Sequence, residues 1–150
     1  MVSIEQLDNE KFIRSLGYLP THNYFIADKS WRPTLQLRGS GSDTWSLFTR
    51  QPHLLIFTKD TLIISKQPVS SEEQAIKIPT NQILNFDVEK LTPYKEFCIS
   101  FEYKKKYYFY IDSGDSFLDS LFNELSYSQL NFYLLLQNNF NGLIKTGFSN

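Results

Sequence analysis

The sequence predicts an α+β fold that is mainly β, with bent antiparallel sheets and with helices near both ends of the chain. Two observations lead to this prediction. Short apolar runs, several of them with a period of two residues, occupy the middle of the chain, and this pattern is typical of strands. Near both ends the apolar residues recur with a period of about 3.6, which is typical of amphipathic helices. With 150 residues the chain has the usual length of one domain.

The composition excludes several classes of protein. Hydrophobic residues make up 41% of the chain and charged residues 21%, which excludes a disordered, collagen-like or coiled-coil protein. The formal net charge of −1 does not favour binding to nucleic acid or to an anionic membrane through the overall field. A spanning helix needs about 20 apolar residues. The longest apolar runs have four or five, and the N-terminus lacks a signal-peptide pattern, so we expect a cytoplasmic protein.

The first expected element is an amphipathic helix at residues 3–16. Ser3 and Gln6 have the spacing of a capping box, in which the hydroxyl accepts from a backbone amide of the first turn. Gly17 follows as a C-terminal stop, and Pro20 prevents the helix from resuming. The apolar residues lie roughly on one face, namely Ile4, Leu7, Phe12, Ile13 and Leu16.

Short strands separated by turns are expected next. They lie at residues 24–26, 35–37, 44–49, 54–58, 62–65, 75–78 and 83–89. Lys59 and Asp60 separate two of these runs, which suits a tight hairpin. The glycine and serine residues at 39–43 are interpreted as a hairpin turn rather than a phosphate-binding loop, because a strand and not a helix follows them.

Residues 97–112 give the clearest strand pattern. Apolar Phe97, Ile99 and Phe101 alternate with polar residues, and the alternation resumes after Lys105. Two half-buried strands joined by a tip of lysines therefore form a hairpin. Cys98 falls on the polar face and is expected to be a structural thiol rather than a reactive one.

Two helices are expected after Gly114. The first carries an apolar stripe made of Phe117, Leu118, Leu121, Phe122 and Leu125. The second, at roughly 128–138, is apolar on nearly every side and must be buried on more than one side. It either covers the sheets together with the N-terminal helix or docks a partner or a second copy of the chain. The residues that would contact such a partner are Leu130, Phe132, Tyr133, Leu135 and Leu136.

This order of elements resembles the pleckstrin-homology-like superfold, in particular its GRAM and bacterial pleckstrin-homology branches. The resemblance rests on two strands around the Thr-Lys-Asp-Thr turn in Leu54–Ile64, on the pair Ile76–Pro79 and Ile83–Val88, and on the hairpin and helical stripe that follow. It implies about seven strands in two bent sheets with a helix closing one open end. It also implies binding sites rather than catalytic residues. The segments it defines are a core at 44–126, an N-terminal extension at 1–43, and an additional C-terminal helix and tail at 127–150.

No enzyme, metal site or cofactor is expected. Cys98 is the only cysteine, so a multi-cysteine zinc site cannot form. His22 and His53 lie far apart in the sequence, and nothing places a nucleophile beside either of them.

Two hypotheses about function remain open. The first is a non-catalytic interaction module that docks a protein, or a second copy of itself, through a sheet edge or through the C-terminal apolar helix. The second is a module that binds a lipid head group or a nucleic acid through the lysine hairpin. The residues of that second site are Lys104, Lys105 and Lys106, joined by Arg38 and Arg50.

Overall fold

The computed structural model describes residues 3–30, 51–69, 74–91, 96–112 and 126–145. In chain order the elements are α1 (Ile4–Ser15), β1 (Tyr24–Ser30), β2 (Gln51–Phe57), β3 (Thr61–Lys66), β4 (Ile76–Pro79), the 3-10 turn η2 (Thr80–Gln82), β5 (Leu84–Leu91), β6 (Glu96–Tyr103), β7 (Lys105–Asp112), α5 (Tyr127–Gln137) and α6 (Asn139–Gly142). The strands expected at 35–37 and 44–49, the turn at 39–43 and the helical stripe from Phe117 to Leu125 lie outside the described residues.

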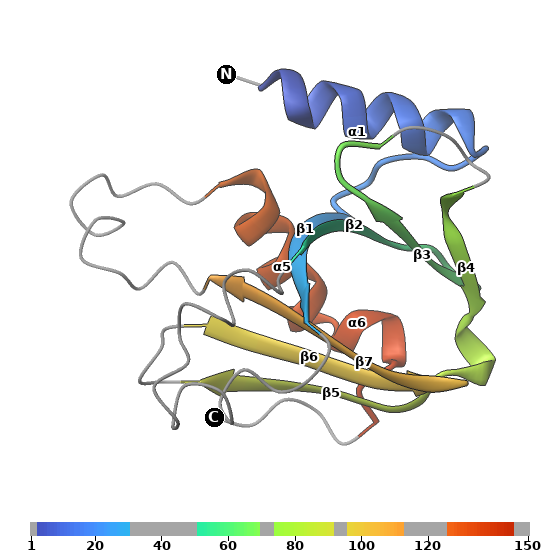
Figure 1. Ribbon diagram of the computed structural model, residues 1–150, viewed down its shortest axis with the longest axis vertical. Helices are drawn as coiled ribbons and strands as arrows, with labels where there is room; N and C mark the ends of the chain where they lie inside the picture. The colour runs from blue at the N-terminus through green and yellow to red at the C-terminus, as the bar shows by residue number, and fades with distance from the viewer. Residues whose placement is uncertain (1–2, 31–50, 70–73, 92–95, 113–125, 146–150) are drawn as a thin grey trace.

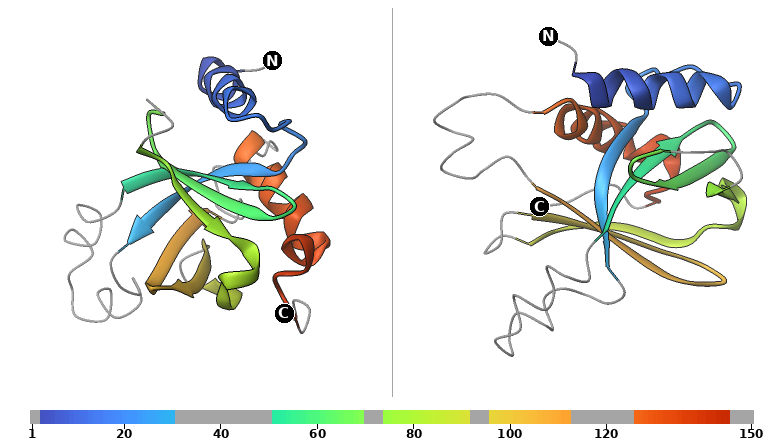
Figure 2. Two further views of the ribbon diagram at one scale, coloured as in Figure 1. Left: turned by 90° about the vertical axis from the view of Figure 1, so that its right-hand side faces the viewer. Right: turned by 45° about the horizontal axis from the view of Figure 1, so that its top comes forward.

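The seven strands form one antiparallel sheet in the order β4-β3-β2-β1-β7-β6-β5. It consists of two meanders, β1–β4 and β5–β7, which join where Asp28–Ser30 of β1 pair with Tyr108–Tyr110 of β7. The sheet bends at this joint, so that its two halves face each other (Figures 1 and 2). The mainly-β α+β fold is therefore confirmed.

The strand expected at 24–26 is present, extends further and is central to the sheet. It is β1, which pairs with β2 on one side and with β7 on the other, although the segment 1–43 was expected to be an extension of the core at 44–126. The pairing that makes β1 central is non-local, so its local signal is only a short apolar run.

The hairpin expected at 97–112 is present. β6 and β7 pair in an unbroken register from Glu96 opposite Asp112 to Tyr103 opposite Lys105. Burial alternates along β6, where Phe97, Ile99 and Phe101 are buried. Tyr110, on the face expected to be wet, is only 2% exposed. It lies between Asp28 of β1 and Cys98 of β6, and a ring flanked by strands on both sides loses most of its contact with water.

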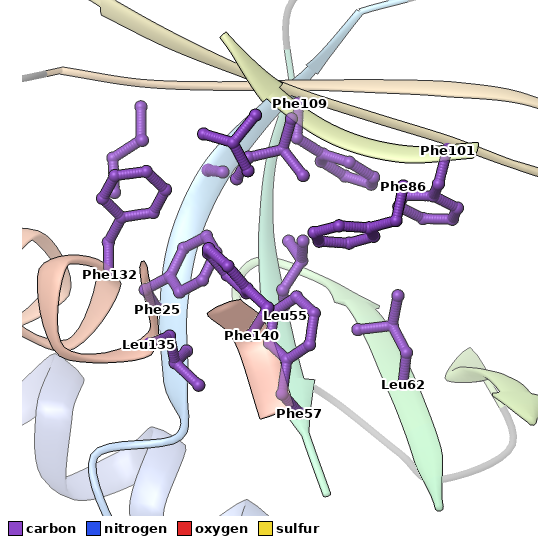
Figure 3. Close-up of a cluster of buried hydrophobic side chains, with 14 of the residues drawn as sticks. Phe25, Leu55, Phe57, Leu62, Phe86, Phe101, Phe109, Phe132, Leu135 and Phe140 are labelled. Carbon is purple, nitrogen blue, oxygen red and sulfur yellow. The ribbon is translucent and has the colours of Figure 1, made fainter. Parts of the chain in front are cut away.

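The main core lies between the two halves of the sheet and is rich in phenylalanine (Figure 3). Phe132 of α5 packs against Phe25 and Phe97, with ring centroids 5.5 and 4.9 Å apart. Phe140 of α6 lies 5.1 Å from Phe57. The open side of the bent sheet is thus closed by α5 and α6, which agrees with the first of the two alternatives for the C-terminal apolar helix, that it covers the sheets. None of the helices in the described part of the chain is long and apolar enough to cross a membrane.

A second, smaller core lies on the outer face of the β1–β4 half, beneath α1 (Figure 2). Phe12 and Ile13 of α1 pack there against the strands through Tyr24, Leu54, Ile56 and Ile63. β2 and β3 are consequently buried on both faces, which explains why their sequences are continuously apolar instead of alternating. The apolar residues expected on one face of α1 are buried only toward its C-terminus, because Ile4 and Leu7 are exposed.

Candidate functional site

The first candidate site is the apolar helix α5, and the structure corrects its residue set. Phe132 and Leu135, expected to contact a partner, are 1% and 3% exposed and belong to the main core. Tyr133 and Leu136 are partly buried against the same core. Leu130 is exposed, at 46%. The buried side chains hold α5 on the sheet, and they offer no surface to a partner.

Polar side chains also fix α5 to β1. β7 pairs with β1 only from Asp28 onward, so the earlier part of this β1 edge needs other partners. The Asn131 side-chain amide donates to the Tyr24 carbonyl oxygen at 2.9 Å. The Ile26 amide donates to Ser128 Oγ at 3.0 Å. Two helix side chains therefore replace a neighbouring strand along this stretch of backbone.

The second candidate site is the lysine tip of the β6–β7 hairpin. Lys104, Lys105 and Lys106 are all exposed there, as expected, and Lys104 has a left-handed backbone with φ of 65°. The ammonium groups of Lys104 and Lys105 lie 5.3 and 5.2 Å from the ring centroids of Tyr103 and Tyr107, respectively. These cation–π contacts hold the lysine stems against the hairpin.

Lys29 of β1 joins this tip, although it was not among the residues predicted for this site. Its ammonium group lies 5.3 Å from the Tyr107 ring centroid. Burial, followed by the charge of Lys105, lowers the pKa of Lys29. Lys29 is adjacent to the tip only because it pairs with Phe109 across the β1–β7 joint, which no local pattern reveals. Arg38 and Arg50, expected to join the tip, lie outside the described residues.

The tip is an open surface, and Glu102 is an acid close to it among the described residues. Glu102 lies opposite Lys106 in the hairpin and accepts a hydrogen bond from the Asn85 side-chain amide. The adjoining hollow of about 180 Å³ is lined by both Glu102 and Lys106, so its walls carry both signs of charge. The four lysines can neutralise a phosphate at the surface, but this hollow does not select for an anion.

The third candidate site is the edge of the sheet. Among the described strands, the terminal ones are β4 and β5. β4 has four residues and ends at Pro79, which has no amide hydrogen to donate. β5 has eight residues and, within the described part of the chain, pairs only with β6. Its register shifts between Leu84 and Asp87, and beyond that point it pairs regularly up to Leu91.

Burial shifts the pKa values of His53 and Cys98. His53 is buried, and burial lowers its pKa. Burial raises the pKa of the Cys98 thiol to about 11, so the thiol is protonated at neutral pH and is a poor nucleophile. In the described ranges no three His, Cys, Asp or Glu side chains come close enough together to hold a metal ion.

No protein-family model matches the chain, and no curated protein is significantly similar to it.

Proposed function

We propose that the protein is a non-catalytic, cytoplasmic interaction module, and that a partner protein adds an extended segment beside β5. The observation that carries this proposal is the eight-residue length of β5 at the end of the sheet, paired on one side only among the described residues. Main-chain hydrogen bonds along such an edge supply affinity, and alternate side chains supply specificity.

The side chains of β5 indicate what such a segment would contain. Phe86 and Val88 face the main core, whereas Asp87 and Glu89 are exposed on the other face of the strand. Opposite charges on directly opposed residues stabilise neighbouring strands. The preferred partner is therefore an extended segment in which apolar residues alternate with Lys or Arg.

The resemblance to the pleckstrin-homology-like superfold supports a binding role. The resemblance implies two bent sheets closed by the helical stripe from Phe117 to Leu125, which lies outside the described residues. The described part of the chain has one bent sheet in two halves, and α5 packs on the core between them, which is a similar arrangement. We therefore propose that the chain belongs to this superfold, which mainly hosts binding sites.

Peptides selected from a random library provide the test. The selected sequences should alternate apolar and basic residues, and their binding should perturb the backbone amide signals of residues 84–91. Asp87→Lys should weaken binding about tenfold. Asp8→Lys, the same change at an exposed position on α1, should leave the binding unchanged.

Peptides that perturb only residues outside 84–91 would contradict the proposal. A dimer in light scattering that is lost with Asp87→Lys would instead identify a second copy as the occupant.

A second candidate function is anion binding at the lysine tip, favoured by the closeness of Lys29 and Lys105 around Tyr107. Replacing Lys104, Lys105 and Lys106 by Ser should change the unfolding free energy little, because exposed charges contribute little to stability. Two probes are used separately: vesicles that contain an anionic lipid, and a short single-stranded DNA. If the protein binds one of these probes, if the affinity falls steeply as salt is added, and if the triple variant no longer binds it, anion binding is favoured over strand addition.

A further inference from the structure

A cleft at the end of the molecule where α5 and α6 meet the β2–β3 turn belongs to none of the sites described above. It consists of two adjoining hollows of about 780 and about 170 Å³, whose walls share Phe57, Thr58, Lys59 and Asn141. The two helices lie beside this end of the β2–β3 hairpin (Figure 2). Pockets for small molecules measure roughly 300–1,000 Å³, so the wider hollow alone has room for one.

The charge of the cleft is positive. Among the described residues that line the two hollows, Lys59 and Lys145 are the charged ones, and no carboxylate accompanies them. Asp60, next to Lys59 in the turn, accepts from the hydroxyls of Thr58 and Thr61 at 3.3 and 3.1 Å and lines neither hollow. An anion in this cleft would be close to ammonium groups and would face no carboxylate in the described walls.

The geometry of the wall defines the proton position on His22. Asn131 is 2% exposed, and its Nδ2 donates to the Tyr24 carbonyl, so its Oδ1 is the atom that faces His22 Nδ1 at 3.0 Å. An amide oxygen can only accept, and Nδ1 must therefore carry a proton. Nε2 is the ring nitrogen that this hydrogen bond leaves for a ligand.

The backbone on both sides of the cleft is held in uncommon conformations. His22 has φ of 59°, and the neighbouring Asn23 side chain fixes it by accepting from the Thr21 amide and donating to the Phe57 carbonyl, both at 3.0 Å. On the opposite side, residues 139–142 have φ of 59°, 50°, 57° and 91°. The fully buried ring of Phe140 anchors this left-handed run. A backbone held in this way loses less conformational freedom when a ligand binds beside it.

A hydrogen bond at the start of that run orients another donor. Asn138 Oδ1 accepts from the Asn141 backbone amide at 3.1 Å, which leaves the Asn138 Nδ2 group with protons to donate.

Apolar side chains complete the wider hollow. Leu19 and Leu134 line it although they are 72% and 38% exposed, and Leu135 adds a buried apolar surface. The cleft thus combines positive charge and amide donors with an apolar wall.

We infer that this cleft binds a small organic anion, a phosphate ester or a carboxylate. Its charged group is neutralised by Lys59, which lines both hollows, and by Lys145 of the smaller hollow, and its apolar body packs on Leu19 and Leu134 in the wider hollow. This inference does not depend on strand addition at β5, because the residues that carry it lie on other elements.

The full chain is titrated with phenyl phosphate, with benzoate and with benzyl alcohol. Changes in the backbone amide NMR signals report the binding of each compound. Both anions should perturb residues 18–23, 57–59 and 138–145, whereas the neutral alcohol should bind at least about tenfold more weakly. The ratio between the two anions distinguishes a phosphate site from a carboxylate site. Equal binding of the alcohol, or no perturbation of these residues by either anion, would overturn the inference.

Two pairs of variants separate the charge from its surroundings. Lys59→Gln with Lys145→Gln should weaken binding of the better anion about tenfold or more. Lys11→Gln with Lys66→Gln removes two exposed lysines outside the cleft and should leave affinity unchanged. Leu134→Gln should weaken phenyl phosphate but not inorganic phosphate. A folded Lys59/Lys145 variant that retains full affinity would show that the anion binds elsewhere.

Discussion

Asn131 shows how much of the joint between α5 and β1 depends on one buried amide. It donates to the Tyr24 carbonyl and accepts from His22, and no other residue in the described part of the chain is shown to satisfy that carbonyl on this edge. Asn131→Ala removes both bonds and leaves a buried carbonyl without its donor, which costs about 1–3 kcal/mol. Urea unfolding measures the loss.

Gln137 provides the matched control for this prediction. It lies on the same helix and is exposed, so Gln137→Ala should change the unfolding free energy by less than about 0.5 kcal/mol. Equal losses in the two variants would mean that α5 is held by its apolar contacts alone.

Phe101 and Ser100 test the β6–β7 hairpin, an element whose two faces were predicted from alternation. Phe101 is 1% exposed and stacks on Tyr107, with ring centroids 5.0 Å apart. Phe101→Asp places an unpaired charge in the main core and should cost about 4 kcal/mol or more. Ser100→Asp, on the other face, places a carboxylate opposite Asp87 of β5 and should cost no more than about 1 kcal/mol. Similar damage from both would contradict the alternation.

The helix α1 is attached partly through phenol groups that pair with its carboxylates. Tyr24 donates to Glu10, and Tyr127 donates to Glu5 at 2.6 Å. Burial and the Glu10 bond raise the pKa of Tyr24 to about 12, and burial and the Glu5 bond raise the pKa of Tyr127 as well. A phenol with a raised pKa in the folded state stabilises fully below its unfolded pKa of about 10 and loses this contribution as the pH rises through its folded pKa.

We therefore expect the unfolding free energy to fall between about pH 10 and pH 12. Cys98 contributes in the same direction, since burial raises its pKa to about 11. Tyr24→Phe and Tyr127→Phe should each reduce the slope of stability against pH in this window, measured by urea unfolding. Tyr108→Phe, outside the α1 network, is the control. If Tyr24→Phe and Tyr127→Phe left this slope unchanged, ionisation of these phenols would not contribute to the pH dependence of the unfolding free energy.

At the scale of the whole molecule, the sequence predicts the elements that carry a local apolar periodicity. Strands β2 to β7 and both long helices lie within a few residues of their expected positions, because each carries its own apolar pattern. The central place of β1 and the closeness of Lys29 to the lysine tip depend on pairing between distant segments, which leaves no local trace. A helix that is apolar all round, such as α5, also gives no indication of which side is buried.

The cleft could not be predicted for a related reason. His22, Lys59 and Lys145 come from three separate segments, and only the packing of α5 and α6 on the β2–β3 end brings them to one place. The left-handed run at 139–142 contains asparagines and a glycine, residue types that tolerate positive φ, but Phe140 within it is a residue for which positive φ is unusual. Its burial against the phenylalanines of the sheet is a tertiary effect.

The last prediction concerns the dependence of the whole fold on its C-terminal segment. Ending the chain after Tyr127 removes, among the described residues, four buried apolar side chains, namely Phe132, Leu135, Phe140 and Ile144, and opens the main core to water. Each loss costs on the order of 2–5 kcal/mol, and their sum reaches the whole stability of a typical domain, about 5–15 kcal/mol. The shortened chain should therefore be unfolded or aggregated, as measured by circular dichroism and light scattering.

Substitutions within the full chain separate closure of the core from docking. Phe132→Ser with Leu135→Ser should unfold the protein, because both side chains lie between the sheet halves. Leu130→Ser with Leu134→Ser changes two exposed positions of the same helix and should leave the thermal unfolding midpoint within a few degrees of its starting value. If the chain ending at Tyr127 remained folded, or if the exposed pair proved as damaging as the buried pair, α5 would not be the element that closes the sheet. If the exposed pair left stability intact but abolished binding of a partner, α5 would combine closure with docking through its outer side alone.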